Sequence, residues 1–319
     1  MANAAILINY NDKENTVRFA RKLQSYNVFN KILVVDNCSP NHDDFIEIHD
    51  ELKEFFIDKK EYLNSLKNSE IKKTAIDLIA TDKNGGYNYA INYGASYLIK
   101  EADYNYFMIA NTDIEIGKIP IQECFKELDT KSLTAVVAPR MKLLDGTYAR
   151  RDCWKERTFK LDVIHATRVL EFFLFSMLRA GEYKQEDYFT AKGARMPVEC
   201  ISGSLFFIRV DVLKQIGMMD ENVFLFYEED ILYKRIKKLN PKLQTICKTN
   251  VDFTHFESKS IGKSYKYYRK MKQLYESKMY YHKTYNNMTS NQELVFKILW
   301  GFRQFELLFE VPIRLLLKK

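Results

Sequence analysis

The densest group of acids in the sequence is Glu228, Glu229 and Asp230, which follow an aromatic run and open a segment with helical spacing. Acids in the first turn of a helix favour its dipole, so the group has a purely structural explanation. Adjacent carboxylates also repel one another, and this repulsion raises the pKa of one or more of them. Because a carboxylate with a raised pKa can remove a proton from a hydroxyl group, we interpret the group as the source of a general base.

Asp113 and His255 are residues whose types suit a bound cation. Asp113 follows the apolar run 106–110, and a carboxylate at a strand end can hold a hard divalent cation that in turn binds a diphosphate. A turn aspartate is the structural alternative. His255 follows the strand-like run 251–253, where a lone histidine more often packs in a core. With an acidic metal site elsewhere in the fold, it becomes a candidate third ligand.

The order of elements in the first half predicts a fold that brings strand ends together. Short apolar runs alternate with segments of helical spacing, which indicates a parallel sheet with helices on both faces. We therefore predict an α/β, Rossmann-like core, in which ligands bind beyond the carboxyl ends of the strands. The predicted strands are residues 4–8, 31–36, 77–80, 106–110 and 135–138, and the predicted helices are 16–23, 42–68 and 89–99.

The second half of the sequence is less regular. Residues 159–178 are compatible with one helix, residues 199–208 have strand character with a Ser-Gly break, and a further helix opens at the acidic group. No Pro-, Gly- or Ser-rich linker separates two domains, so we predict one continuous domain with a C-terminal extension.

Polar residues follow each of the first four predicted strands. Each set could merely cap a helix or form a turn. Their succession along one edge of one sheet instead favours a shared binding pocket. The sets are residues 9–11, 36–37, 82–86 and 111–113.

The charge is unevenly distributed along the 319 residues. Residues 259–319 carry 13 basic and 4 acidic side chains, whereas the rest of the chain carries 36 basic and 38 acidic ones. We therefore expect any acidic partner to contact the C-terminal segment. With 46% hydrophobic residues and only 11 glycines and 6 prolines, the composition excludes collagen-like and globally disordered proteins.

Several classes of protein lack their marks in this sequence. The five scattered cysteines form no CxxC pair, which argues against a zinc site or a disulfide framework and favours a reducing cytosol. We expect neither a signal peptide nor a membrane-spanning helix, because no uncharged apolar stretch is long enough. GxGxxG, HExxH, GxSxG and a complete P-loop are all absent, which removes dinucleotide redox, zincin, hydrolase and Walker-type sites.

Taken in order, six motifs resemble those of the family 2 glycosyltransferases, inverting enzymes with the GT-A fold that use nucleotide sugars. Within that family, the sequence resembles the subgroup of bacterial rhamnosyltransferases and related enzymes of capsule, O-antigen or cell-wall polysaccharide assembly. Each motif is weak alone, but the ordered set spans roughly residues 4 to 260. The motifs are INYN (8–11), VVDN (34–37), KNGGYNYAINYG (83–94), ANTD (110–113), ISGS (201–204) and FYEEDIL (226–232).

The resemblance implies a role for each matching residue. The base and ribose of the nucleotide would contact Tyr10, Asn11 and Asp36, and the backbone at Asn84 and Gly85 would approach the nucleotide closely. A Mg²⁺ or Mn²⁺ ion on the diphosphate would be held by Asp113, with His255. The remaining implied positions are Asn111 on the donor side, Ser202, Gly203 and Glu228 on the acceptor side, and Glu229 or Asp230 as general base.

Two departures from the family pattern bear on these roles. Asn111 replaces the first acid of the DxD element, which leaves the metal with fewer acidic ligands. In the motif that contains the general base, the family usually spaces its acids as Glu-Asp-x-Asp, whereas here the three acids are contiguous. We favour Glu229 as the base, with Asp230 as the alternative.

The implied activity is metal-dependent, inverting transfer of a sugar from dTDP-rhamnose or a UDP-sugar to a hydroxyl of an undecaprenyl-diphosphate-linked saccharide. A nucleotidyltransferase is an alternative, although residues 8–14 lack the Gly- and Lys/Arg-rich phosphate loop it would need. A non-catalytic, membrane-attached nucleotide-sugar-binding partner of a polysaccharide assembly complex is another. Retention of the acids and of Asp113 favours the enzyme.

The C-terminal extension suggests where the enzyme works. We predict a catalytic domain at 1–260 and a basic, helical extension at 261–319. Between residues 294 and 317 the polar side chains Arg303, Glu306, Glu310 and Arg314 form one stripe on an otherwise apolar helix, as expected for a helix lying in a membrane interface. Packing on the catalytic domain, or a homodimer contact, is the alternative. We expect an anionic membrane surface rather than nucleic acid as partner, at the cytoplasmic face of the plasma membrane.

Overall fold

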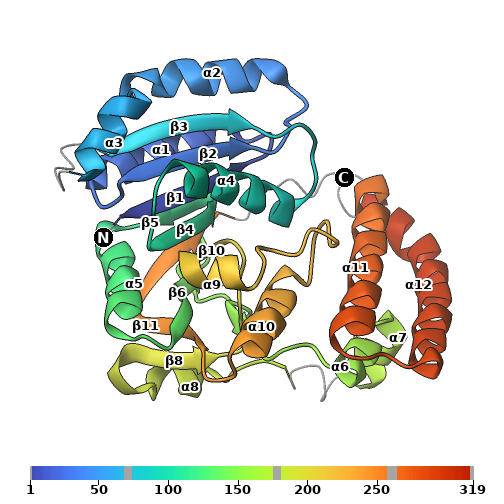
Figure 1. The fold of residues 1–319 in the computed structure, drawn as a ribbon. Coiled ribbons are helices and arrows are strands. Elements are labelled where there is room, and N and C mark those ends of the chain that lie inside the picture. Colours follow the sequence, from blue (N-terminus) through green and yellow to red (C-terminus); the bar gives the residue numbers. More distant parts are fainter. Residues whose placement is uncertain (1, 68–73, 175–180, 257–263, 317–319) are drawn as a thin grey trace.

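The computed structural model describes residues 2–67, 74–174, 181–256 and 264–316 (Figure 1). Side chains are described within these ranges except at 185, 264–266 and 311–316. The predicted domain boundary after residue 260 and the predicted helix ends at 68, 178 and 317 lie outside the described residues.

A nine-stranded sheet forms the centre of the described structure, in the order β3-β2-β1-β4-β10-β6-β11-β5, with β8 paired to β11. Each of the five strands predicted in the first half lies within one observed strand, whereas the strand-like segment 199–208 is divided at its Ser-Gly break into two strands. The strands are β1 (Asn3–Asn9), β2 (Lys31–Asp36), β3 (Ala75–Ala80), β4 (Tyr106–Asn111), β5 (Ile114–Ile116), β6 (Thr134–Lys142), β8 (Arg195–Val198), β10 (Leu205–Arg209) and β11 (Gln244–His255).

The first four strands run parallel to one another, so their carboxyl ends share one edge, as predicted. The second half of the sheet is mixed, because β10 runs antiparallel to both β4 and β6. The α/β fold class is thus confirmed, while the sheet is less uniformly parallel than the apolar runs suggested. A fully buried strand has the same composition in either direction, which is why the sequence pattern does not distinguish the two.

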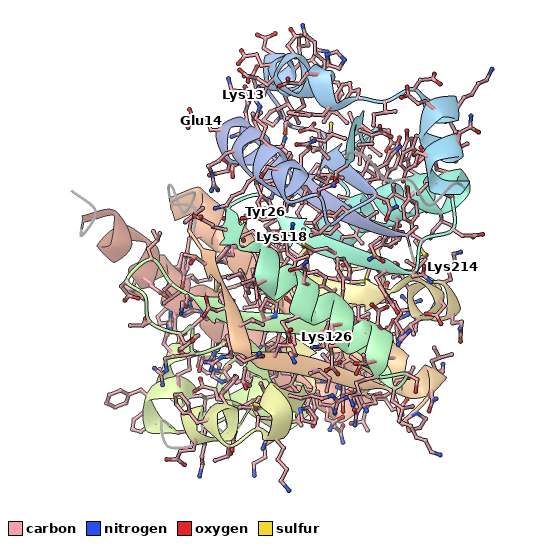
Figure 2. All side chains as sticks on the ribbon, turned by 90° about the vertical axis from the view of Figure 1, so that its left-hand side faces the viewer. Lys13, Glu14, Tyr26, Lys118, Lys126 and Lys214 are labelled. Carbon is pink, nitrogen blue, oxygen red and sulfur yellow. The ribbon has the colours of Figure 1, made fainter. Side chains whose placement is uncertain are left out.

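Alternate side chains of the sheet feed two separate hydrophobic cores. On β1, Ala5 and Leu7 pack on one face and Ala4, Ile6 and Ile8 on the other. The first face is covered by α1 (Lys13–Tyr26), α2 (His42–Leu52) and α5 (Lys118–Thr130), and Figure 2 shows α1 and α5 lying across it. The second face is covered by α3 (Lys59–Lys67), α4 (Tyr87–Glu101), α9 (Val210–Gln215) and α10 (Glu228–Leu239).

Two predicted helices are each divided in the structure. Residues 42–67 form α2, a 3-10 turn at Lys53–Phe55 and α3. Residues 159–173 form α6 (Phe159–Ile164) and α7 (Arg168–Phe173). The division of the second pair follows from its threonines, because the hydroxyls of Thr158 and Thr167 each accept from a backbone N–H and begin a new helix. A two-stranded sheet of β7 (Cys153–Trp154) and β9 (Cys200–Ile201) and the short α8 (Gln185–Phe189) complete this half.

Two long C-terminal helices, α11 (Ser264–Tyr285) and α12 (Ser290–Leu316), lie side by side with α6 and α7 at one end (Figure 1). Tyr275 of α11 stacks on Trp300 of α12 with ring centroids 4.7 Å apart. Among the described residues, no helix combines the length and apolar character needed to cross a membrane.

A buried group of charges centred on Asp162 joins these helices to the rest of the protein. The carboxylate has no exposed surface and accepts from the Tyr227 hydroxyl at 2.6 Å, from His282 Nε2 at 2.8 Å and from Arg157 Nη1 at 3.2 Å. Lys278 donates to the backbone carbonyl of Asp162 at 3.2 Å. Burial opposes ionisation of Asp162, but the lysine, the histidine and the arginine outweigh it and hold the pKa of the carboxyl well below its ordinary value.

We expect Asp162→Asn to lower the free energy of unfolding by about 3–5 kcal/mol, because removing one member of a buried ionic group leaves the others uncompensated. Asp103→Asn is the control, since Asp103 is exposed and such changes cost within about 0.5 kcal/mol. Denaturant titrations of both variants at neutral pH measure the difference. Because the pKa of Asp162 is lowered in the folded state, its contribution is complete above the ordinary value of 3.8 and is lost as the pH falls below it. Equal stability of the two variants would show that the group is not a stabilising hub.

Candidate active site

A cavity of about 380 Å³ opens beside the carboxyl edge of the sheet, and the three acids lie in its wall. Of the predicted site residues it is lined by Asn111, Ser202, Gly203, Glu228, Glu229, Asp230 and His255. Sequence reasoning missed other parts of the wall, including Tyr87, Trp154, Arg157 and Tyr227. Tyr87 and Tyr227 lie within the motifs at 83–94 and 226–232, but no role was given to them. Trp154 and Arg157 lie outside every motif, and nothing in the sequence pattern selected them.

The acids are held at the start of α10 by an unusual backbone turn. Phe226 and Tyr227, which precede Glu228, have φ angles of +73° and +69°. This left-handed conformation is unfavourable for bulky residues and persists only where surrounding contacts impose it. The Tyr227 hydroxyl bonds to the buried Asp162, so the charge group of the C-terminal helices fixes the turn that carries the acids.

A glycine at the carboxyl edge supports the same turn. Gly86, directly before α4, has a φ of +93°, and a Cβ atom there would lie 2.3 Å from the carbonyl oxygen of Phe224. The next residue, Tyr87, donates its backbone N–H to that carbonyl at 3.2 Å. At Gly86 the close approach is thus to another segment of the chain, whereas a Cβ at Gly85 would meet only the Tyr89 side chain. The predicted approach of the backbone at Asn84 and Gly85 to a nucleotide stays a prediction.

Asp230 is buried and both of its carboxylate oxygens are occupied. Oδ1 accepts from the backbone N–H of Arg157 at 2.7 Å, and Oδ2 accepts from the Trp154 indole at 3.2 Å. Burial raises its pKa to about 7, although Arg157 acts in the opposite direction. The side chain thus holds residues 154–157 against α10.

Glu229 is the acid of the three that keeps partial exposure, as Glu228 and Asp230 are almost fully buried. Its Oε1 accepts from the backbone N–H of Gly203 at 2.9 Å. Burial, reinforced by the charge of Glu228, raises the pKa of Glu229, and burial likewise raises that of Glu228. On the opposite wall, the Tyr87 hydroxyl donates to the Gly203 carbonyl at 2.6 Å, which fixes the 202–204 segment on its other side.

Asp113 and His255 are brought together by the pairing of β5 with β11, with His255 Nε2 lying 3.4 Å from Asp113 Oδ1. Nε2 is buried and has no hydrogen-bond partner within the part of the chain that the structure describes. A carboxylate beside an imidazole nitrogen without a partner fits two ligands of a divalent cation. No group of three or more His, Cys, Asp or Glu side chains suited to a metal occurs among the described residues, so the remaining ligands would come from phosphate and water.

The other predicted nucleotide-binding residues gather along the carboxyl edge without lining the cavity. Asp36 accepts from the Asn9 side chain and the Ser39 hydroxyl, both at 2.6 Å. The neighbouring Asn37 donates to Asn84 at 3.2 Å. Tyr10 is half exposed beside them, and Asn11 follows with a left-handed φ of +56°. The structure therefore forms one polar edge from these residues, continuous with Asn111 at the end of β4.

Comparison with known proteins gives a relative and structural neighbours. No family model matches the sequence. Residues of this chain are 25% identical over 189 positions to the low-salt glycan biosynthesis hexosyltransferase Agl10 of Haloferax volcanii. That alignment covers 57% of this chain and 55% of the relative, so the chain matches about half the length of that protein.

Two glycosyltransferase structures resemble the fold. GalNAc-T7, crystallised with UDP, GalNAc and Mn²⁺, superposes with a TM-score of 0.55 over 98% of this chain and 57% of its own, at 12% identity. The mannosyltransferase PcManGT of Pyrobaculum calidifontis, solved with GDP-mannose and Mn²⁺, gives a TM-score of 0.49 over 87% of this chain and 64% of its own, also at 12% identity. The first superposition defines the fold as GT-A-like, with added C-terminal helices.

We expect Asp113→Asn and His255→Ala each to weaken Mn²⁺ binding in the presence of UDP by at least about tenfold, because each removes one of the two side chains predicted to bind the cation. Electron paramagnetic resonance of free Mn²⁺ measures this binding without any turnover. His49→Ala is the matched control, since His49 is exposed on α2. Unchanged Mn²⁺ affinity in both variants would contradict the assignment of this pair.

Proposed function

We propose that this chain is a metal-dependent, inverting glycosyltransferase that moves a sugar from a nucleoside-diphosphate donor to a hydroxyl acceptor. The observation that carries the proposal is that His255 and the partly exposed Glu229 line one cavity, and that Asp113 lies 3.4 Å from His255. The GT-A-like fold and the hexosyltransferase relative support it. The resemblance of the motifs favours dTDP-rhamnose or a UDP-sugar as donor and a bacterial surface polysaccharide as the product.

The polar edge of the sheet would bind the nucleotide. Tyr10, Asn11 and Asp36 would contact base and ribose, while Asn84 and Asn111 line the path toward the diphosphate. Asp113 and His255 would hold Mg²⁺ or Mn²⁺, which neutralises the charge that develops on the departing nucleoside diphosphate. The donor sugar would then project into the cavity toward α10.

Glu229 would act as the general base from the other side of the cavity. Its raised pKa makes it a stronger base than an ordinary glutamate, and its partial exposure lets it reach an acceptor hydroxyl. The hydrogen bond from Gly203 fixes one oxygen and leaves the other for the proton. Attack opposite to the leaving group inverts the anomeric centre in a single displacement. Asp230 is the less suitable base because Trp154 and Arg157 occupy both oxygens.

We expect Glu229→Gln to reduce sugar transfer by about 10²–10⁴-fold, the usual contribution of a general base. Glutamine keeps an oxygen for the Gly203 N–H, so donor binding should be retained. The test measures nucleoside diphosphate release from UDP-, dTDP- and GDP-sugars with Mn²⁺, with Mg²⁺ and with EDTA. Glu186→Gln, on an exposed part of α8, is the control.

The pH dependence of kcat/KM tests the assignment of Glu229 as the general base. Only the deprotonated base is active, so the rate rises with pH through the raised pKa of Glu229, well above the ordinary value of 4.5. Donor binding without transfer, unaffected in Glu229→Gln, would favour the non-catalytic nucleotide-sugar-binding partner. Release of pyrophosphate instead of a nucleoside diphosphate would favour a nucleotidyltransferase.

The arrangement of the C-terminal helices supports a lipid-linked acceptor. The polar stripe of α12 faces inward, where Arg303 bonds to Glu306 at 2.9 Å and to Glu310 at 2.7 Å. Glu306 also accepts the backbone N–H groups of Arg168 and Val169 at the start of α7. The inward side of α12 thus contains this polar stripe together with the buried Phe296 and Leu307.

The apolar side of α12 faces outward. We call it, with the neighbouring exposed face of α7, the apolar surface. Its α12 side chains are between 39% and 69% exposed, and its α7 members, Val169, Phe172 and Phe173, are also exposed. The α12 members are Leu294, Val295, Ile298, Phe302, Phe305, Leu308 and Phe309.

We assign a bilayer with anionic headgroups as the partner of the apolar surface. Exposed large side chains gathered on one helix mark an interaction site. The segment 259–319 carries 13 basic against 4 acidic residues, and exposed Arg269, Lys270, Lys272, Lys283 and Lys297 lie on α11 and α12. Basic residues beside an apolar helix face are typical of binding to anionic lipid.

We expect the protein to sediment with vesicles containing phosphatidylglycerol, and Phe302→Ser/Phe305→Ser to weaken this binding by at least about tenfold, because each buried aromatic side chain contributes 1.5–3 kcal/mol. Ile119→Ser/Leu144→Ser, which changes exposed apolar residues elsewhere, is the control. If the protein instead forms a homodimer that Phe302→Ser/Phe305→Ser abolishes, and does not bind vesicles, then a second copy of the chain covers the apolar surface.

A further inference from the structure

A second cavity, of about 260 Å³, adjoins the first. Trp154, Arg157 and Ser202 line both cavities. By contrast, Asn111 and His255, from the metal side, line only the first. Two of the shared residues, Trp154 and Arg157, bond to Asp230, and Ser202 precedes Gly203, whose N–H bonds to Glu229. The wall between the cavities is therefore built by the segments that contact the acids, which is where the acceptor rather than the donor would be.

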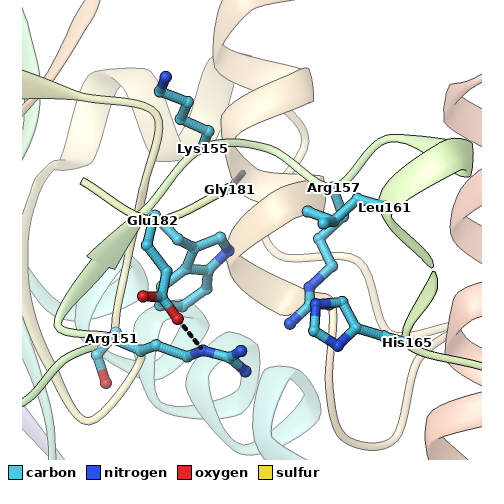
Figure 3. A pocket seen from close by; sticks show the side chains of 9 residues that line it. Arg151, Lys155, Arg157, Leu161, His165, Gly181 and Glu182 are labelled. Atoms are coloured by element: carbon cyan, nitrogen blue, oxygen red, sulfur yellow. Dashed lines mark hydrogen bonds and ion pairs between the residues drawn. The ribbon is translucent and has the colours of Figure 1, made fainter. Parts of the chain in front are cut away.

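The walls of this second cavity are rich in nitrogen donors. Arg151, Lys155, Arg157 and His165 line it, against a single carboxylate, that of Glu182 (Figure 3). In Figure 3 the Arg151 guanidinium extends past Glu182, while the Arg157 guanidinium and the His165 ring lie next to each other across from it. Nitrogen donors on two sides of a small cavity suit an oxyanion.

The two arginines differ in how firmly they are held. Arg157 is anchored on the buried Asp162 at 3.2 Å, and its own backbone N–H is bonded to Asp230. Arg151 is 52% exposed and lies 3.4 Å from Glu182. A pair this exposed contributes little stability, so Arg151 can exchange its contact with Glu182 for a stronger contact with a phosphate group.

We propose that this cavity binds the diphosphate of the acceptor, which rests on the proposed function and names the chemical class of the acceptor as a prenyl-diphosphate-linked saccharide. Guanidinium groups match phosphate oxygens in a bidentate manner. Arg151 and Arg157 hold the two phosphates, and Trp154 and Ser202 at the junction contact the first sugar. The acceptor hydroxyl then reaches Glu229 in the first cavity.

The position of the apolar surface agrees with this ligand. His165 lies three residues before α7, whose Phe172 and Phe173 belong to the apolar surface. Glu306 of α12 fixes the start of α7 through two backbone N–H groups. A diphosphate in the cavity would thus be near the headgroup layer. Its prenyl chain could then stay in the bilayer while the diphosphate is bound to the protein.

The experiment titrates the full-length protein with inorganic pyrophosphate in EDTA, by isothermal calorimetry, and repeats the titration with farnesyl diphosphate in detergent. We expect Arg151→Gln to weaken pyrophosphate binding by about tenfold, as loss of one charge-assisted contact predicts, and Arg151→Lys to recover part of it. Arg150→Gln is the matched control, because Arg150 neighbours Arg151 and faces Glu182 at 3.9 Å but does not line the cavity.

Two features of the experiment distinguish binding in this cavity from binding at the donor site, namely the presence of EDTA and the variant Asp113→Asn. EDTA removes the cation on which diphosphate binding at Asp113 would depend, and pyrophosphate binding should survive in Asp113→Asn. Tighter binding of farnesyl diphosphate than of pyrophosphate, dependent on Arg151, identifies a lipid-linked source. Pyrophosphate alone binding in the Arg151-dependent manner would overturn the prenyl part of the proposal.

Equal affinities in Arg151→Gln, Arg150→Gln and the wild type would overturn the site itself, as would no binding by the wild type. These titrations contain no donor, so their result does not depend on the proposed transfer reaction. That reaction is tested separately by the release of nucleoside diphosphate. Thermal unfolding of each variant confirms that a lost affinity is not a lost fold.

Discussion

The buried carboxylate of Asp162 is the contact on which the organisation of this protein depends. It lies between Tyr227, at the turn before the three acids, and His282 of α11, so one charge ties the C-terminal helices to the candidate active site. An unpaired charge in that position would be very costly. The C-terminal helices therefore pack as part of the same body as the candidate site, and the acids owe their position partly to residues more than fifty places away in sequence.

The second organising feature is the division of labour among three adjacent acids. Burial raises the pKa of all three, but their contacts differ. Asp230 holds the segment that contains Trp154 and Arg157, and only Glu229 combines a fixed oxygen with partial exposure. A helix start with contiguous acids can thus serve structure and chemistry together, so the structural role seen for Asp230 leaves Glu229 available for the proposed role of base.

The sequence predicted what depends on local pattern. The strands, their shared carboxyl edge and the proximity of polar residues at that edge follow from apolar runs and from what comes after them. Asp113 and His255 are 142 residues apart, yet both could be named as candidate ligands because both end or follow strands, and the structure places them 3.4 Å from each other. Long-range contacts were not predictable: nothing local marks Asp162, Trp154 or Arg157, and the stripe of α12 gives the same helical pattern whether its polar side faces protein or solvent.

The absence of a side chain at Gly86 has a wider consequence. Its backbone lies against the carbonyl of Phe224, and even one methyl group would collide with it at 2.3 Å. The loop that begins at the nucleotide edge and the turn that carries Glu229 are thus in direct mechanical contact. The effects of substitutions in the two segments on stability should therefore not be additive, because each segment limits the side chains that the other can accept.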